Sequence, residues 1–151
     1  MEQHENATKV ILIKEGITKC YLTEENDKEY IIEFLGKGEI VGEIELLRKM
    51  PCLCSIQAIT DVTVHAIPYF NSLLGKDILL NNLLLQVFAE RIINTSARAS
   101  FQQLYTAEYS LSKLQNLQSK QKIEISKQEQ AAYLGITIRS LNRAIKNLEN
   151  I

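Results

Sequence analysis

Three basic residues near the end of the chain recur at a spacing suited to binding a polyanion. Arg139, Arg143 and Lys146 are four and three residues apart, so they share one face of an α-helix. Leu141 and Leu148 fall on the opposite, apolar face. In the major groove of DNA an arginine can make two hydrogen bonds to guanine, while neighbouring basic side chains reach phosphates. The pattern therefore favours DNA binding over the alternative, the solvated face of an ordinary amphipathic helix.

The residues just before this helix follow the order of a helix-turn-helix motif. Ser126 and Glu129 have the spacing of a capping box, which begins a first helix. Gly135 can take the left-handed conformation that ends a helix, and Thr137 can cap the next one. A connection of three or four residues that includes a glycine is typical of this motif. The segment therefore predicts that the basic helix is a recognition helix.

The cysteines offer less specific chemistry. Cys52 and Cys54, with distant Cys20, do not reach the four ligands of a structural zinc or iron–sulfur site, so we expect no metal and no cofactor. On an alternating strand Cys52 and Cys54 would share one face as small buried residues, and a thiol-responsive regulator that uses this pair is the alternative. The sequence holds no nucleophile–base pair, paired-carboxylate site or glycine-rich phosphate loop, so it predicts a protein that is not an enzyme.

The segments that must position these residues are strands followed by helices. Before Pro68, short apolar stretches recur with glycine or polar turns between them, which predicts a small antiparallel β-roll. The predicted strands cover residues 10–13, 17–22, 30–35, 54–58 and 62–67. After Pro68 no proline occurs, and Asp77 can cap a long helix from about Ile78 to Tyr105. The predicted fold class is α+β, with a β-roll sensor-like domain over 1–76, a dimerisation helix over 77–105 and a helix-turn-helix domain over 106–151.

The long helix carries a broad apolar stripe that needs cover. Leu80, Leu84, Val87 and Arg91 recur at alternating spacings of four and three residues. The preceding roll could bury one side of the helix, and a second copy of the same helix is the obvious cover for the other. We therefore expect a parallel homodimer with these four residues at its interface, and burial wholly within one chain is the alternative.

Composition and charge limit the function further. The 151 residues are 46% hydrophobic and 23% charged, the balance of a globular protein. No apolar run reaches the ~18 residues of a membrane span, and the polar N-terminus with an odd number of cysteines favours the reducing cytoplasm. Residues 1–60 carry seven Lys or Arg and eleven Asp or Glu (−4), whereas residues 111–151 carry seven and three (+4). This asymmetry suggests a nucleic-acid-binding segment attached to a part with another role, and an uneven surface is the alternative.

The order of β-roll, long apolar helix and helix-turn-helix resembles the Crp/Fnr family of bacterial transcription regulators, from about Val10 to Leu148. The family's strand–glycine–strand hairpin is matched by ILIKEGITKCYL, and the stretch that leads into its ligand pocket by LGKGEIVGEIELL. Its helix-turn-helix is matched by ISKQEQAAYLGITIRSLNRAIKNLE, the most specific of the three. Two short segments, GEIELL and QAI, resemble the YeiL-like branch of this family in particular.

The resemblance implies a homodimer whose sensor roll adjusts how two recognition helices meet successive major grooves of double-stranded DNA. Lys127, Gln128 and Glu129 match the start of the first helix, which in relatives touches the DNA backbone or faces RNA polymerase. Ile138 occupies a position where several relatives carry a groove-reading arginine, so we expect a different target sequence. The predicted DNA-binding residues are Lys127, Gln128, Thr137, Ile138, Arg139, Ser140, Asn142, Arg143 and Lys146.

The resemblance also places a ligand pocket at Gly42 and Glu43. Relatives that bind a cyclic nucleotide use such a pair for the ribose and a later Arg-Ser pair for the phosphate. At the matching distance this chain reads CLCS over residues 52–55, without an arginine. A buried cyclic phosphate without a charged partner is strongly disfavoured, so we predict that the protein does not bind cAMP with useful affinity.

Both ends of the chain look short for this family. Relatives have a helix and strands before the segment that begins at Val10, and a β-hairpin wing after the recognition helix. We therefore expect a shortened gene product, a natural minimal form or a cloned fragment. The alternative function that follows is a sensor and dimerisation protein that no longer binds DNA.

Overall fold

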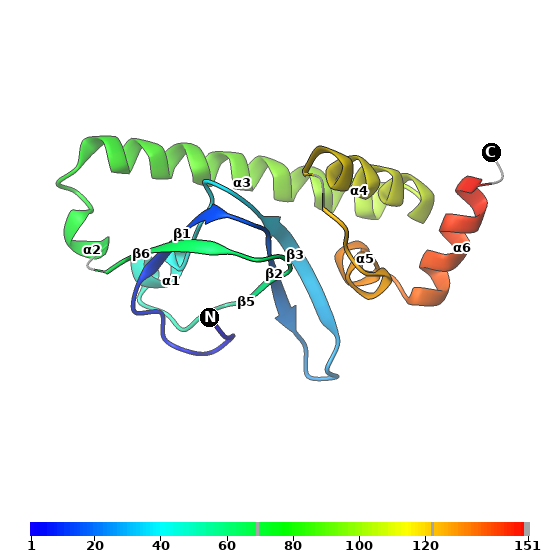
Figure 1. The fold of residues 1–151 in the computed structure, drawn as a ribbon, viewed down its shortest axis with the longest axis horizontal. Coiled ribbons are helices and arrows are strands. Elements are labelled where there is room, and N and C mark those ends of the chain that lie inside the picture. The colour runs from blue at the N-terminus through cyan, green and yellow to red at the C-terminus, as the bar shows by residue number, and fades with distance from the viewer. Residues whose placement is uncertain (69, 122, 150–151) are drawn as a thin grey trace. The chain divides into compact units, whose positions relative to one another are not determined.

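Alternating apolar residues form short strands in the first part of the chain (Figure 1). The computed structural model describes residues 1–68, 70–121 and 123–149, and the chain divides into two units, Met1–Gln86 and Val87–Ile151. The described strands of the first unit are β1 (Val10–Glu15), β2 (Thr18–Thr23), β3 (Glu29–Leu35), β4 (Ile40–Val41), β5 (Ser55–Ala58) and β6 (Thr63–Ile67). They form two antiparallel sheets, with strand orders β4-β1-β6 and β3-β2-β5.

The turn between β1 and β2 requires a glycine. Gly16 has a φ of 86°, and a Cβ at this position would collide with the backbone oxygen of Asp61 in the turn between β5 and β6. Next to it, the backbone oxygen of Ile17 accepts a hydrogen bond from the N–H of Ile59 at 2.9 Å. The two turns are therefore packed directly against each other.

Both sheets contribute to the core of the first unit. Ile13, Cys20, Leu35 and Val41, from four different strands, form one buried cluster. Met1 packs against this cluster, and its backbone oxygen accepts a hydrogen bond from the N–H of Ile56 at 3.0 Å. The first residues of the chain are thus part of the packed unit.

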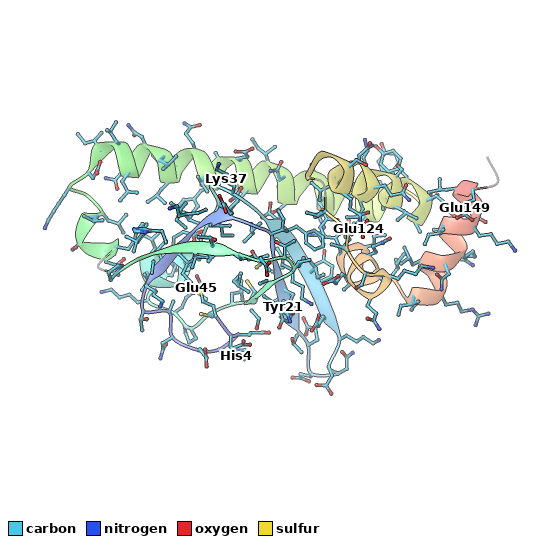
Figure 2. All side chains as sticks on the ribbon, in the orientation of Figure 1. His4, Tyr21, Lys37, Glu45, Glu124 and Glu149 are labelled. Atoms are coloured by element: carbon cyan, nitrogen blue, oxygen red, sulfur yellow. The ribbon has the colours of Figure 1, made fainter. Side chains whose placement is uncertain are left out.

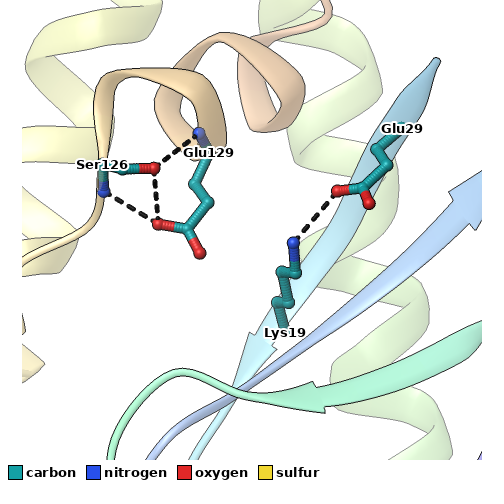
Figure 3. Close-up of polar contacts among 4 residues, drawn as sticks. All are labelled: Lys19, Glu29, Ser126 and Glu129. Carbon is teal, nitrogen blue, oxygen red and sulfur yellow. Dashed lines mark hydrogen bonds and ion pairs between the residues drawn. The ribbon is translucent and has the colours of Figure 1, made fainter.

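One charged residue is also held within the sheet β3-β2-β5. The side chain of Lys19 on β2 is only 9% exposed, and its Nζ lies 3.0 Å from Glu29 Oε2 on β3 (Figure 3). The same Nζ is 4.7 Å from the ring centre of Tyr21, which lies on β2 (Figure 2). The carboxylate and the ring together compensate for the partial burial of the ammonium group.

A helix, α1 (Glu43–Arg48), lies in a segment for which the residue pattern predicted neither a strand nor a helix. It begins after Gly42, with a φ of 87°, and ends at Lys49, which is also left-handed. It buries Glu43 and Glu45. Because its buried side is acidic and it is short, apolar periodicity could not predict it.

The loop after α1 corrects a second expectation. β5 begins at Ser55, so Cys52 and Cys54 lie before the strand and not on one face of it. The backbone of Cys52 instead pairs with the first residues of the chain: its N–H donates to Glu5 at 2.7 Å and its oxygen accepts from His4 at 2.8 Å. The prediction of a shared strand face is therefore wrong.

Two helices follow β6: α2 (Phe70–Leu73) and α3 (Ile78–Leu104). Asp77 Oδ1 accepts hydrogen bonds from the backbone N–H groups of Leu79 and Leu80 at 2.9 and 3.1 Å. This confirms the predicted N-terminal cap, and the end of α3 agrees with the predicted one to within a residue. Within the described residues, no helix is both long and apolar enough to cross a membrane.

The second unit contains, after the end of α3, the helices α4 (Ala107–Gln121), α5 (Lys127–Leu134) and α6 (Ile138–Glu149). Its core includes Leu111, Leu114 and Leu141, each 1% exposed or less. Antiparallel sheets followed by a long helix and a C-terminal group of helices confirm the predicted α+β fold class. The domain boundaries at residues 76 and 105 stay predictions.

Candidate nucleic-acid interface

The candidate interface begins at the start of α5, which is held by the predicted capping box. Ser126 Oγ accepts a hydrogen bond from the N–H of Glu129 at 3.2 Å, and Glu129 Oε2 accepts one from the N–H of Ser126 at 2.8 Å (Figure 3). Both bonds satisfy amides that a helix start leaves without partners. The sequence-based prediction of this cap is confirmed.

The turn between α5 and α6 also has the predicted local geometry. Gly135 ends α5 in the left-handed region, with a φ of 66°. Thr137 Oγ1 then accepts a hydrogen bond from the N–H of Ser140 at 3.1 Å, and the two hydroxyl oxygens are 3.0 Å apart. Thr137 therefore caps α6, and its hydroxyl and that of Ser140 already bond to each other.

Small and apolar residues hold α6 on its buried side. Leu141 and Ala144 are 0% and 1% exposed, and Ala131 and Leu134 of α5 are buried as well. The alanines let the helices approach closely. Because this side is fixed by packing, the opposite side of α6 has a defined orientation.

That opposite side is polar and solvent-facing. Arg139, Asn142, Arg143 and Lys146 are exposed, as the helical spacing predicted. Ile138, in the first turn, is 44% exposed. The exposed side thus combines three cations and an amide with one apolar side chain near the start of the helix.

The start of α5 is joined to this surface. Lys127 Nζ donates a hydrogen bond to Asn142 Oδ1 at 3.2 Å, although the two residues are 15 positions apart. Gln128, next to Lys127, is exposed. The structure thus brings Lys127 and Asn142 together, and Gln128 follows Lys127 in the sequence.

An acidic residue that sequence reasoning missed lies at the edge of the basic side. Asn147 Nδ2 donates to Glu108 Oε1 at 2.7 Å, which links α6 to α4. This hydrogen bond is the main cause of a lowered pKa of Glu108, and the charge of Arg143 adds to it. Glu108 is far from Arg143 in the sequence, so no local pattern could have indicated it.

A second missed group anchors the end of α5 to α3. The backbone oxygen of Tyr133 accepts hydrogen bonds from Arg98 Nη2 at 2.7 Å and from Gln102 Nε2 at 3.0 Å. The guanidinium carbon of Arg98 also lies 4.0 Å from the centre of the Tyr133 ring. A cation at a helix C-terminus is electrostatically favourable, so Arg98 helps to fix α5 and the turn that follows it.

The residues predicted for the dimer interface lie on a side of α3 that the chain partly covers. Leu84 is 4% exposed, and Leu80, Val87 and Arg91 are half-buried. The large apolar side chains that remain exposed on α3 lie elsewhere on the helix. They are Ile78, Leu79, Leu83, Leu85, Ile92, Ile93 and Leu104, with exposed fractions between 58% and 82%.

The predicted ligand-pocket residues lie at the start of α1. Glu43 is 1% exposed, and a Cβ on Gly42 would lie 2.9 Å from the backbone oxygen of Lys9. The basic residues that follow them at the end of α1, Arg48 and Lys49, are exposed. No group of three or more His, Cys, Asp or Glu residues suited to a metal ion occurs in the part of the chain that the structure describes.

Comparisons with known proteins cover both the first unit and the whole chain. A sequence model of the family described as "Cyclic nucleotide-binding domain" matches residues 1–77. A search of curated proteins found no match.

Solved structures of bacterial proteins, two of them described as regulators, share the fold across almost the whole chain. A CRP-family transcriptional regulator of Thermus thermophilus has a TM-score of 0.85 at 13% identity, over 99% of this chain and 79% of the other. The c-di-GMP responsive global regulator CLP of Xanthomonas campestris has a TM-score of 0.82 at 18% identity, over 99% and 81%. FixK2 of Bradyrhizobium japonicum has a TM-score of 0.81 at 18% identity, over 99% and 78%.

Proposed function

Because the chain belongs to the cyclic nucleotide-binding domain family and has the fold of CRP/FNR regulators, we propose that it is a sequence-specific DNA-binding transcriptional regulator. The observation that carries this proposal is the exposed basic side of α6, presented after a capped α5 and a left-handed glycine turn. The cytoplasm is the compartment that goes with this function, and RNA polymerase is a further proposed partner.

The contact residues have different proposed roles. Arg139, Arg143 and Lys146 supply positive charge to bases and phosphates in the major groove, joined by Lys127 and the polar groups of Gln128 and Asn142. Thr137 acts mainly by capping α6, because its Oγ1 accepts the backbone N–H of Ser140, and the two hydroxyl groups also bond to each other. Ile138 offers an apolar contact of the kind that suits a thymine methyl group, which an arginine at that position would not provide.

A second copy of the chain is the proposed cover for α3. Ile78, Leu85 and Ile92 are seven residues apart and 74%, 64% and 66% exposed, which matches one position of a coiled-coil heptad. Ala89, four residues after Leu85, supplies a small residue at the other core position of the heptad. The dimer contact we propose is therefore shifted around the helix from the predicted Leu80, Leu84, Val87 and Arg91, of which Leu84 is already buried.

The proposed regulator does not use cAMP as its effector. Glu43 is buried, and the segment that follows α1 offers cysteines and a leucine where a cyclic phosphate needs a cation. Isothermal titration of the protein with cAMP should give no binding in the micromolar range, and micromolar binding would overturn this part of the proposal.

The DNA-binding proposal is tested with duplexes selected from a randomised library and a salt titration. Arg143→Ala should weaken binding by roughly 5- to 100-fold, because a good arginine contact to DNA is worth about 1–3 kcal/mol. Arg48→Ala, which removes the same charge from an exposed position on α1, is the matched control and should bind like the wild type. Absence of salt-dependent binding would favour a dimerising protein that does not bind DNA, and equal binding by both variants would exclude Arg143 as a DNA contact.

The dimer is tested separately by light scattering during size-exclusion chromatography. Leu85→Glu places a charge in the proposed contact between the two α3 helices and should convert a dimer to a monomer. Leu53→Glu, at a residue that is 53% exposed in the loop before β5, is the control. A dimer that persists in the Leu85 variant would exclude this side of α3 as the dimer contact.

A further inference from the structure

Two cysteine thiols of the first unit are in contact although they lie 34 residues apart in the sequence. Cys20 Sγ donates a hydrogen bond to Cys54 Sγ across 3.1 Å. The sulfur atoms of a disulfide are about 2.05 Å apart. A bond between these two atoms therefore requires them to approach by only about one ångström more.

The pairing of β2 with β5 brings these residues together. In this antiparallel pair Tyr21 lies opposite Ser55 and Cys20 opposite Ile56. Cys54 directly precedes β5 and is two residues from Ile56, so it lies diagonally across from Cys20. The contact depends on strand register, so the spacing of the cysteines in the sequence could not predict it.

The two thiols differ in access to solvent. Cys20 is 9% exposed and belongs to the buried cluster with Ile13, Leu35 and Val41. Cys54 is half-buried at the edge of this cluster and accepts the hydrogen bond from Cys20. Cys54 is therefore the thiol that a small oxidant reaches first, and Cys20 is the neighbour held next to it.

Cys52 is much less suited to this chemistry. It is 2% exposed, and burial, followed by the charge of Glu45, raises the pKa of its thiol. A raised pKa lowers the fraction of thiolate, which is the reactive form of cysteine. The pair formed by Cys52 and Cys54, which the sequence alone indicated, is therefore not the reactive one.

We propose that Cys20 and Cys54 form a reversible disulfide when the protein meets a hydroperoxide. The sulfur of Cys54 attacks the peroxide oxygen, which gives a sulfenic acid on Cys54 and releases water, or an alcohol if the peroxide is organic. The sulfur of Cys20 then attacks the sulfenic sulfur, which forms the disulfide. The sulfenic hydroxyl leaves as water, taking the proton of the Cys20 thiol. Two electrons pass from the two thiols to the peroxide, and a dithiol reductant, which is itself oxidised to a disulfide, restores the two thiols.

The bond links two parts of the first unit. β2 is the central strand of the sheet β3-β2-β5, and Cys54 lies in the connection from α1 to β5. Oxidation would therefore tie the loop that follows α1 to the central strand of a sheet, and Gly42 and Glu43 lie at the other end of that helix. This modification site does not depend on the proposed DNA binding, since no residue of the second unit takes part.

The test maps the disulfide in the native full-length chain. The protein is treated with equimolar hydrogen peroxide, remaining thiols are blocked by alkylation, and tryptic peptides are analysed by mass spectrometry. We expect peptide 20–28 linked to peptide 50–76, with fragmentation at Leu53 assigning the bond to Cys54 and not Cys52. The linked species should lose the mass of two hydrogen atoms and disappear after dithiothreitol. A bond between Cys52 and Cys54, a bond between two chains, or alkylation of all three thiols would overturn the proposal.

Variants provide an independent readout. Cys54→Ala should abolish the linked peptide, while Cys52→Ala, which makes the same change at a buried neighbour, should retain it. The map of the wild-type protein decides the proposal even if the Cys54 variant does not fold. Since the assay contains no DNA, its outcome is separate from that of the DNA-binding experiment.

Discussion

The buried acids of the first unit and the exposed arginines on α6 of the second unit have opposite roles. In the first unit Glu43 and Glu45 are 1% and 8% exposed, and Lys19 is paired with Glu29. In the second unit α6 leaves its arginines exposed to solvent. Burial of a charged group costs free energy unless polar partners compensate, so charges in the first unit must be satisfied inside the fold. The exposed charges of α6 instead remain available to a partner.

This difference separates two kinds of mutational effect. A change of a buried charge in the first unit should alter folding, whereas a change of an exposed charge on α6 should alter binding. The stability of the second unit should depend mainly on its apolar contacts, together with Arg98, the buried cation that anchors α5.

The largest effect is therefore expected from an apolar residue of the second unit. Leu141 is completely buried, so Leu141→Ala leaves a cavity and should lower the free energy of unfolding by about 2–5 kcal/mol. The change is measured by urea denaturation followed by circular dichroism. Leu148→Ala, at a half-buried position of the same helix, is the control and should cost less. Equal losses from the two variants would mean that α6 is not held by this core.

A somewhat smaller effect is expected from a buried charge of the first unit. Glu43→Ala should lower the stability of this unit by about 2–3 kcal/mol, because the side chain is 1% exposed and its removal leaves a cavity in the fold. Glu43→Gln keeps the size and the hydrogen-bonding oxygen, so it should lose less. Thermal melting measures both variants, and DNA affinity of the folded protein should stay unchanged. A loss of DNA affinity as large as that of Arg143→Ala would contradict the expectation that buried charged residues of the first unit affect folding and not DNA binding.

The smallest effect should come from Glu108, an acid at the edge of the basic side of α6. Its pKa in the folded protein lies below the usual 4.5, chiefly because Asn147 donates a hydrogen bond to it. The carboxylate therefore adds stability above pH 4.5 that is lost as the pH falls through its lowered pKa. The effect is small because solvent screens the group.

The pH dependence is measured as the difference in melting temperature between the wild type and Glu108→Gln. The difference should be present near neutral pH and close on acidification. A difference that is constant with pH would assign the contribution to packing of this side chain and not to its charge.

The comparison of the two units also explains how far the sequence could predict the structure. In the second unit the decisive signals are local: the bonds of Ser126 with Glu129 and of Thr137 with Ser140 each span three residues. Such contacts can be predicted from a short window, and the turn at Gly135 follows from the conformational freedom of glycine. The face of α6 that is exposed follows from helical periodicity alone.

The features that could not be predicted depend on contacts between distant segments. Cys20 meets Cys54 through strand register, and Arg98 meets Tyr133 across 35 positions. The periodicity of α3 indicated a long apolar helix, but apolar residues occur on several of its sides. Which side the chain covers is a tertiary property, so the face proposed for a second copy is displaced from the predicted one.

The collision that requires a glycine at position 16 restricts which substitutions and loop-length changes the chain can accept during evolution. Gly38 and Gly75 also have positive φ angles, of 90° and 76°, yet a Cβ there would meet nothing within 4 Å. Asparagine tolerates such angles, so it is an acceptable replacement at those two positions. At Gly16 the obstacle is the backbone of Asp61, which no side-chain change can remove. We therefore expect the β1–β2 turn and the β5–β6 turn to change together in evolution. A change of length in either turn requires a compensating change in the other.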